Sequence, residues 1–473
     1  MKNIVFLGIG LWVLFNLQSC NNWLDVKPET EVEVDRMFEN QYGFQSALTG
    51  VYLELKNASV YGGQLMYGTI EYLAQHWEVN SNENLKALSR YNYMNGNVQG
   101  SMNGIYSQLY TVIAYANGIL EKIDNKKDVF EPGMYEIIKG EALAIRAYCH
   151  LDLLRLWGPM PAQVKPGKIL PYVRTVTIAY HDHHTYDEYV ALLKADLTEA
   201  ERLLKQADPV LAEHEETHLS ISATDFLKAR QLRMNYYAVQ GLQARFYLWL
   251  GGTENKAKAY AFAREVKEAT DKDGQLRYTL GSAEEITNED YAFSCEHIAA
   301  IYDYNMYERV TRLFKESSAY IKEKNIVVPE LYAAGTTDIR FTGLWTELTA
   351  SNGAKSHVVK KFWQKDGSGA INQMPLLRLA EIYLILIECG TLEEANEYYK
   401  EFCLSRDIPV VDIQDEMQVR NLLIEEYNKE FYGEGQAFYM YKRLAVEDIL
   451  WAEDPGNEES YVVPLPQSEI KYE

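Results

Sequence analysis

The sequence predicts a mainly α-helical protein in which tetratricopeptide-like helix pairs form an α-superhelical scaffold, with a less regular, loop-rich part alongside. Two observations predict this fold. Apolar residues recur with the helical period along most of the chain, in paired segments. Residues 57–103, rich in Tyr, Asn and Gly, and residues 273–370, with short β-prone runs, interrupt the pattern. Paired helices that stack share one elongated core, so each pair supports its neighbour.

The first 19 residues have the features of a lipoprotein signal peptide. The apolar stretch from Ile4 to Phe15 follows Lys2 and is too short to cross a bilayer, which takes about 20 residues. The sequence "LQSC" then places a large aliphatic residue, a spacer and a small residue before Cys20. In a bacterial chain this lipobox predicts cleavage before Cys20 and its acylation. Several acyl chains would hold the protein on a membrane.

The net charge limits the kinds of partner, and four cysteines remain after Cys20. A net charge of −22 argues against nucleic acid and acidic phospholipid, because both require a basic surface. No later stretch of 18 uncharged apolar residues exists, so the lipid is the predicted membrane attachment. Cys149, Cys295, Cys389 and Cys403 form no CxxC pair. Buried free thiols are favoured, although a secreted chain permits a disulfide.

The predicted elements follow one another along the chain in five parts after the signal peptide. Residues 20–56 hold the mature start and a first helix, and 57–103 form the first irregular region. Residues 104–272 hold helix pairs, with helices over 104–123, 134–157, 186–206 and two within 238–267. Residues 273–370 form the second irregular region, with short strands. Residues 371–473 hold the last pairs, over 376–403 and over 416–432 with 435–452, and a tail.

Two helix pairs have well-defined stripes and boundaries. Within 238–267 the first helix carries Ala244, Tyr247 and Leu248, and a Gly251-Gly252 stop separates it from a second helix with Ala257, Ala261 and Val266. Within 376–403 the stripe residues are Ala380, Tyr383, Leu384, Ala395 and Tyr399, with Gly390 between the helices. Capping boxes at Thr391-x-x-Glu394 and Thr185-x-x-Glu188 predict two helix starts. Tyr247 and Tyr383 are therefore expected in the core.

The irregular regions supply the candidate ligand-binding residues, because long loops on a regular scaffold usually carry binding. Aromatic rings pack on the C–H faces of sugars, while amides and carboxylates bind hydroxyl groups; the same chemistry serves peptides. The candidates are Trp77, Asn80, Asn82, Tyr91, Tyr93 and Asn97 in the first region and Tyr302, Tyr304, Tyr307 and Trp345 in the second. If both regions form one site, Trp77→Ala and Trp345→Ala weaken binding and leave the melting temperature nearly unchanged.

Five sequence blocks between residues 20 and 473 carry a family resemblance: "CNNWLDVKPETEV", "GEALAIRAYCHLDLLRLWGPMP", "LLRLAEIYLILIECG", "LIEEYNKEFYGEGQAFYMYKRL" and the closing "YVVPLPQSEIKYE". In this order they resemble the SusD/RagB family of nutrient-uptake lipoproteins. The resemblance implies about four tetratricopeptide-like units and a non-catalytic protein. It also implies a place on the outer face of the outer membrane, over a SusC-like TonB-dependent β-barrel transporter. There the protein would capture an oligosaccharide or a peptide.

Two histidine motifs could indicate a metal site, and an enzyme remains the second hypothesis for the function. "HEETH", residues 214–218, matches the zinc pattern H-E-x-x-H, yet it lies in a charged connector without an apolar inner stripe. "HDHH", residues 181–184, precedes a capping box and fits an exposed helix entry. No metal site or cofactor is predicted. A helical-hairpin glycoside hydrolase remains the alternative, because such enzymes also bind glycans with aromatic residues between paired helices.

Overall fold

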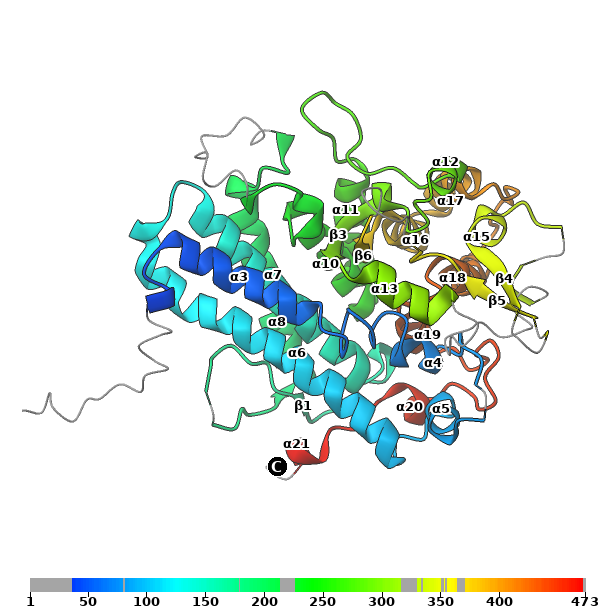
Figure 1. The fold of residues 1–473 in the computed structure, drawn as a ribbon, viewed down its shortest axis with the longest axis horizontal. Helices are drawn as coiled ribbons and strands as arrows, with labels where there is room; N and C mark the ends of the chain where they lie inside the picture. The colour runs from blue at the N-terminus through cyan, green and yellow to red at the C-terminus, as the bar shows by residue number, and fades with distance from the viewer. Residues whose placement is uncertain are drawn as a thin grey trace, which may run out of the picture.

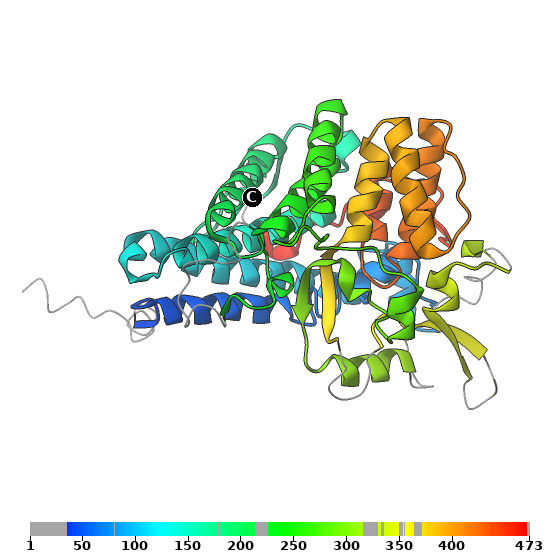
Figure 2. The ribbon, with the colours of Figure 1, turned by 90° about the horizontal axis from the view of Figure 1, so that it is seen from above.

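The chain is mainly helical, as predicted. The computed structural model describes residues 36–79, 81–177, 179–212, 226–315, 330–332, 335–349, 353, 355–363 and 371–470. Within these ranges helices alternate with a few short strands. Figure 2 shows the long helices of residues 41–207 on one side of the molecule and the helices of residues 379–430 on the other. The predicted signal peptide and Cys20 lie outside the described residues.

The long helices of residues 36–212 lie side by side and form the first half of the scaffold (Figure 1). They are α3 (Gln41–Leu55), α6 (Gly96–Ile123), α7 (Met134–Trp157) and α8 (Tyr186–Ala207). Helix α7 packs against both α6 and α8 and is buried along almost its whole length. The capping box at Thr185 is present, so α8 begins where its sequence predicts.

The second half of the scaffold repeats the paired design. Helices α10 (Tyr236–Leu250) and α11 (Thr253–Lys267) form one pair, and α16 (Leu379–Cys389) and α17 (Leu392–Arg406) form another. Gly251 and Gly252 make the first turn with φ of 68° and 77°, which residues with a side chain rarely adopt. Tyr247 and Tyr383 are both 6% exposed, so their predicted core positions are confirmed.

One predicted stripe is wrong. Ala257 and Ala261 of α11 point outward, whereas Ala259, Ala263 and Val266 are buried. Residues 259, 263 and 266 are spaced by four and three positions and therefore share one helix face, while 257 and 261 lie on another. Helix α11 therefore packs on its neighbours through the face that carries Val266, and the sequence stripe combined residues of two faces.

The last helices are α18 (Glu416–Glu430) and α19 (Ala437–Leu444). Both lie within the predicted segments 416–432 and 435–452, but α19 ends eight residues before 452. Ala445 ends it with φ of 50°, in the left-handed region. The short turn between the two helices, residues 431–436, is buried and contacts the first irregular region. This turn therefore packs the C-terminal helices against the first irregular region.

The strands pair in small antiparallel sheets within the described residues: β1 (Lys168–Leu170) with β2 (His184–Thr185), β3 (His297–Tyr302) with β6 (Gln373–Arg378), and β4 (Trp345–Thr349) with β5 (Lys355–Val359). The shorter helical elements are α4 (Thr69–Leu73), α5 (Glu83–Ser89), η2 (Asp124–Val129), η3 (Pro161–Gln163), η5 (Arg230–Leu232), α12 (Ala283–Thr287), η6 (Ser294–Glu296), α13 (Met306–Val310), η7 (Thr311–Lys315), α15 (Ile339–Thr342), α20 (Glu458–Tyr461) and α21 (Gln467–Ile470). Strand β6 leads directly into α16, which ties this sheet to the helical scaffold.

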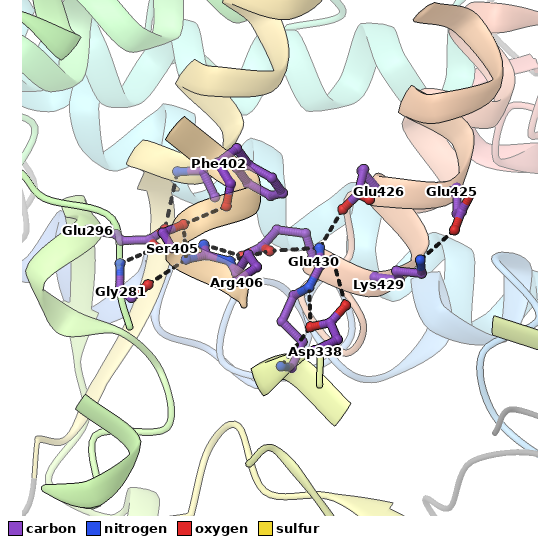
Figure 3. Close-up of polar contacts among 12 residues, drawn as sticks. Gly281, Glu296, Asp338, Phe402, Ser405, Arg406, Glu425, Glu426, Lys429 and Glu430 are labelled. Carbon is purple, nitrogen blue, oxygen red and sulfur yellow. Dashed lines mark hydrogen bonds and ion pairs between the residues drawn. The ribbon is translucent and has the colours of Figure 1, made fainter. Parts of the chain in front are cut away.

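A buried ion-pair network joins the irregular part to α17 and α18 (Figure 3). Glu430 of α18 accepts from Arg378 Nη1 at 2.5 Å and from Arg406 Nη2 at 2.9 Å. Arg378 and Arg406 both also bind Glu296, on the segment before β3. Burial raises the pKa of Glu430, but the three arginines around it, Arg340 included, outweigh this and hold that pKa well below its ordinary value.

This network explains two of the sequence blocks. Arg378 comes from "LLRLAEIY", and Glu426, Glu430 and Glu434 come from "LIEEYNKEFYGEG". Each of the three acids contacts an arginine of the network. A carboxylate in a protein interior is stable only when it is paired and hydrogen-bonded. The residues of these blocks that belong to the network, Arg378, Glu426, Glu430 and Glu434, are therefore buried structural groups that a ligand does not reach.

Candidate functional site

The two tryptophans predicted to bind ligand are buried in the core. Trp77 is 0% exposed and donates from Nε1 to the Tyr67 carbonyl at 2.7 Å. Trp345 is 6% exposed. Both rings meet the ring of Tyr432 edge to face, at centroid distances of 5.3 and 4.8 Å. The two irregular regions therefore do come together, but they do so inside the protein.

This burial corrects the sequence analysis on Trp77 and Trp345. Neither ring presents a face to solvent, so neither is available to a ligand in this structure. From this burial we now expect the alanine variants to lower the melting temperature, in contrast to the sequence expectation, because truncating a buried aromatic residue leaves a cavity. The residues that cover Trp77 include Phe314 and, from the turn between α18 and α19 more than 350 positions later in the chain, Tyr432 and Gly433.

Tyr91 and Tyr93 are also structural. They are 7% and 6% exposed. The Tyr91 hydroxyl lies 3.0 Å from Gln75 Nε2 and donates to the Leu73 carbonyl at 3.2 Å. Tyr93 donates to the Ser460 carbonyl at 2.7 Å, which ties the first irregular region to α20. Burial raises the pKa of Tyr91 to about 12. Both hydroxyl groups make hydrogen bonds within the protein. The prediction that Tyr91 and Tyr93 bind ligand is therefore corrected: both are core residues.

The predicted asparagines lie on the surface near α5. Asn82 is exposed, and its side chain caps the start of α5 by accepting from the backbone of Asn84 and Leu85. Asn97 is exposed and donates to Asn84 Oδ1 at 2.8 Å. Asn80 lies outside the described residues. Asn82 and Asn97 remain candidate contacts for a ligand, although each already has a local structural role.

Three predicted tyrosines form an exposed aromatic surface. Tyr302 ends β3, Tyr304 lies in the turn that follows, and Tyr307 is the second residue of α13; their exposed fractions are 50, 68 and 37%. We call these three residues the tyrosine face. Successive residues of an extended chain point to opposite sides, so Asp303 between the first two is buried. The alternation turns both rings toward solvent.

The backbone beneath the tyrosine face is fixed by polar contacts. The Asp303 amide donates to the Asn372 carbonyl at 2.9 Å. The Asp303 carboxylate lies 2.6 Å from Arg309 Nη2, and Arg309 donates from Nη1 to the Gly62 carbonyl at 2.6 Å. The first irregular region therefore supports the tyrosine face from below through Gly62. A rigid platform of this kind binds with little loss of conformational entropy.

Two lysines border the tyrosine face. Lys56, just after α3, lies over the Tyr304 ring, with Nζ 5.0 Å from its centroid. Lys315 lies 5.4 Å from the Tyr307 centroid and 4.7 Å from the ring of the half-buried Trp363. Sequence analysis missed these three neighbours. The lysines carry no local motif, and Lys56 reaches Tyr304 only through the folding of α3 against β3.

The histidines of residues 181–184 and the four cysteines are not arranged as a metal site. His183 is buried and lies 3.4 Å from Glu469, and His184 Nδ1 accepts from the Tyr172 amide at 3.1 Å. Residues 214–218 lie outside the described residues. In the described ranges no group of three or more His, Cys, Asp or Glu side chains is placed to hold a metal. Cys149, Cys295, Cys389 and Cys403 are all free thiols.

Among the described residues, every helix is too short or too polar to cross a bilayer. Helix α7, for example, has 24 residues but carries Glu141, Arg146, Asp152 and Arg155, all in ion pairs within the protein.

Part of the sequence matches a known protein family. The family model described as "Starch-binding associating with outer membrane", a SusD-like family, matches residues 22–248. This range includes the mature start and the α7 block that carry part of the sequence resemblance. Over these residues, slightly less than half of the chain, the sequence is similar to the SusD-like family. The resemblance noted in the sequence is thereby confirmed.

Relatives and solved structures agree with this assignment. Two SusD-like proteins of Formosa agariphila are each 27% identical, over 172 and 207 residues, which are 35% and 43% of this chain. The matched segments span 32% and 38% of those relatives, about a third of their length. A SusD-like carbohydrate binding protein from Bacteroides vulgatus has a TM-score of 0.70 at 17% identity, covering 91% of this chain and 96% of its own. A SusD superfamily protein from Bacteroides thetaiotaomicron has a TM-score of 0.65 at 20% identity, covering 91% and 98%.

Proposed function

We propose that this SusD-like chain is a cell-surface lipoprotein that captures an oligosaccharide at the tyrosine face and delivers it to a TonB-dependent outer-membrane transporter. The single observation that carries the proposal is the exposure of Tyr302, Tyr304 and Tyr307 on one rigid segment. Single exposed aromatic residues are common, but a contiguous exposed apolar surface often marks a binding site, and neighbouring aromatic residues can form such a surface. The family's description as starch-binding supports a carbohydrate as the ligand.

The chemistry of the tyrosine face suits a sugar. A pyranose ring has flat C–H faces that pack on an aromatic ring and hydroxyl groups that need polar partners. Tyr302 and Tyr304 offer such rings, and their hydroxyl groups both donate and accept hydrogen bonds. Lys56 adds a donor beside Tyr304. Two rings on neighbouring exposed positions can contact successive sugar units, which favours an oligosaccharide over a single sugar.

The attachment to the membrane is proposed from the lipobox. Acylation at Cys20 would place the protein on the bilayer, 21 positions before the start of α3 at Gln41. The lipid would then hold the scaffold at the membrane surface, where a membrane partner is within reach. The description of the family as associating with the outer membrane supports this location.

The carboxylates near the tyrosine face support a protein that binds its ligand without catalysis. A glycoside hydrolase requires two carboxyl groups on opposite sides of the scissile bond, about 5 to 9.5 Å apart. On the described segment around these tyrosines, Glu308 is exposed, but Asp303 is 0% exposed and paired with Arg309. Asp303 therefore cannot reach a bound sugar. The alternative of a glycoside hydrolase predicts new reducing ends when the protein is incubated with oligosaccharides.

The experiment is calorimetric titration of the chain with a glycan found by array screening. Tyr304→Ala removes a 68% exposed ring and should weaken binding by about 1 to 2 kcal/mol, the usual loss for an aromatic anchor. Tyr115→Ala is the matched control, because Tyr115 is 49% exposed but lies on α6. Equal affinities for Tyr304→Ala, Tyr302→Ala and the wild type would reject the tyrosine face, and reducing ends released by the wild type would reject a binding-only role.

A further inference from the structure

A pocket of about 260 Å³ opens beside the tyrosine face. It lies between α3, residues 226–233 and the end of β3, and Tyr302 belongs to both the pocket and the face. Its charged lining residues are Lys56, Lys228 and Arg233, and its described lining contains no Asp or Glu. We call it the basic pocket. An all-cationic lining is unexpected in a chain with 68 acidic and 46 basic residues.

The acids behind the basic pocket are buried and shared between several partners. Glu141 is 0% exposed and accepts from Arg230 at 2.6 Å, from Arg233 at 3.3 Å and from the Tyr52 hydroxyl at 2.7 Å. Asp303 is likewise 0% exposed, and it lies closer to Arg309, at 2.6 Å, than to Lys56, at 3.8 Å. One carboxylate therefore serves two cations in each case.

The local balance of charge is positive. Among the described residues around the pocket, ion pairs join four cations to three carboxylates, an excess of one positive charge: Lys56, Arg230, Arg233 and Arg309 against Glu141, Asp208 and Asp303. Because all three carboxylates are buried, the surface that a ligand meets is more positive than this balance indicates.

Arg233 is held in a geometry that suits an acid group. Its guanidinium lies 4.0 Å from the Phe226 ring centroid and 5.3 Å from that of Tyr52. Stacking fixes the plane of the guanidinium, so its donors are already oriented and little entropy is lost when they bind. Its described hydrogen bond, from Nη1 to Glu141, is long at 3.3 Å. A fixed guanidinium can hold a carboxylate or a sulfate with two parallel hydrogen bonds.

Lys56 connects the basic pocket with the tyrosine face. Its Nζ lies 3.8 Å from Asp303, beyond hydrogen-bond distance, and 5.0 Å from the Tyr304 ring centroid. A sugar that stacks on Tyr304 therefore has the Lys56 ammonium group at its edge, and the next group along can enter the pocket. Glu308, the exposed carboxylate on α13, lies next to Tyr307 and disfavours an acid group on that side.

We propose that the oligosaccharide bound at the tyrosine face is acidic, with a uronic carboxylate or a sulfate ester in the basic pocket. This inference rests on the proposed function and names the class of its ligand. The sugar ring packs on Tyr302 or Tyr304, and its acid group binds Lys56 and Arg233. A charge-assisted hydrogen bond contributes about 1.5 to 3 kcal/mol, which corresponds to a preference of about tenfold to a hundredfold over the uncharged sugar.

The test compares oligosaccharides that differ only in their acid groups. The full chain is titrated calorimetrically with tetragalacturonate and with its methyl ester, and with a sulfated carrageenan tetrasaccharide and its desulfated form. The first pair tests a carboxylate and the second a sulfate. Lys56→Gln removes one cation whose side chain is 18% exposed, so the fold should tolerate it. Lys56→Arg keeps the charge, and Lys194→Gln on the exposed side of α8 makes the same charge change elsewhere.

The expected result is that one acidic probe binds at least about tenfold more tightly than its neutral partner. Lys56→Gln should abolish most of that preference, while Lys56→Arg and Lys194→Gln retain it. Salt should reduce the preference, because it screens exposed charges. Equal binding of the neutral and acidic members of each pair would overturn the inference and leave the proposed function standing. No binding by any of the four probes would also overturn the inference, whereas the proposed function is tested separately, by titrating Tyr304→Ala and Tyr302→Ala with the glycan found by array screening. Loss of the preference in Lys194→Gln would also overturn the inference.

Discussion

Replacing Trp77 by alanine tests the corrected view of the first irregular region. The side chain is 0% exposed, and its ring contacts Tyr432 and Phe314 at centroid distances of 5.3 and 5.9 Å. An aromatic side chain buries roughly 200 Å², and at about 25 cal/mol per Å² this corresponds to about 5 kcal/mol. Alanine keeps part of that burial, and the Tyr67 carbonyl loses the indole donor. We therefore expect Trp77→Ala to lower the free energy of unfolding by about 4 kcal/mol.

The assay is urea unfolding followed by circular dichroism. Trp77→Phe keeps an aromatic ring against Tyr432 and should cost about half as much, since it loses mainly the hydrogen bond and part of the volume. Tyr304→Ala is the exposed control and should change stability by less than about 0.5 kcal/mol. A wild-type unfolding midpoint for Trp77→Ala would refute the assignment of Trp77 to the core and return it to the ligand surface.

The remaining predictions concern the scaffold, the buried ion pairs and the anchor. Tyr383→Ala should destabilise by about 3 kcal/mol in urea unfolding, because the ring is 6% exposed and its hydroxyl donates to Glu401; a change below about 1 kcal/mol would place it outside the core. Glu430 has a pKa below its ordinary value of 4.5 in the folded chain, so its stabilising contribution is present above about pH 4.5 and is lost as the pH falls through the depressed value. Glu430→Gln should therefore lower stability at pH 7 by about 3 to 5 kcal/mol, and its unfolding midpoint should depend less on pH between 7 and 3; an unchanged midpoint at pH 7 would contradict the ion-pair network. Cys20→Ala should abolish acylation and release a folded chain from the membrane fraction; fatty-acid labelling that persists in this variant would rule out the lipobox.

The helical scaffold could be predicted from the sequence because its signals are local. The capping boxes at Thr185 and Thr391 each satisfy backbone groups within four residues, and both are present in the structure. The stripe of α11 shows the limit of such signals. Alanines occur at 257, 259, 261 and 263, so composition alone fits two helix faces, and only packing against α10 and α16 selects the face with Ala259 and Ala263.

The candidate site could be predicted only in part, because exposure depends on distant residues. Tyr302 and Tyr304 are exposed because strand alternation buries Asp303 between them, a local effect. Trp77 has polar neighbours in sequence but is covered by the turn at residues 432–433. The basic pocket combines Lys56 with Arg233, which are 177 positions apart in the sequence, so no local sequence pattern predicts the pocket.

The most direct test of the central claim is a crystal structure of the chain with a bound oligosaccharide. The account predicts sugar density stacked on Tyr302 or Tyr304, beside Lys56, with Trp77 and Trp345 still covered by the protein. The larger groove of about 940 Å³ between α11, α16 and α18 is the competing location. Sugar density in that groove, with the tyrosine face empty, would contradict the account.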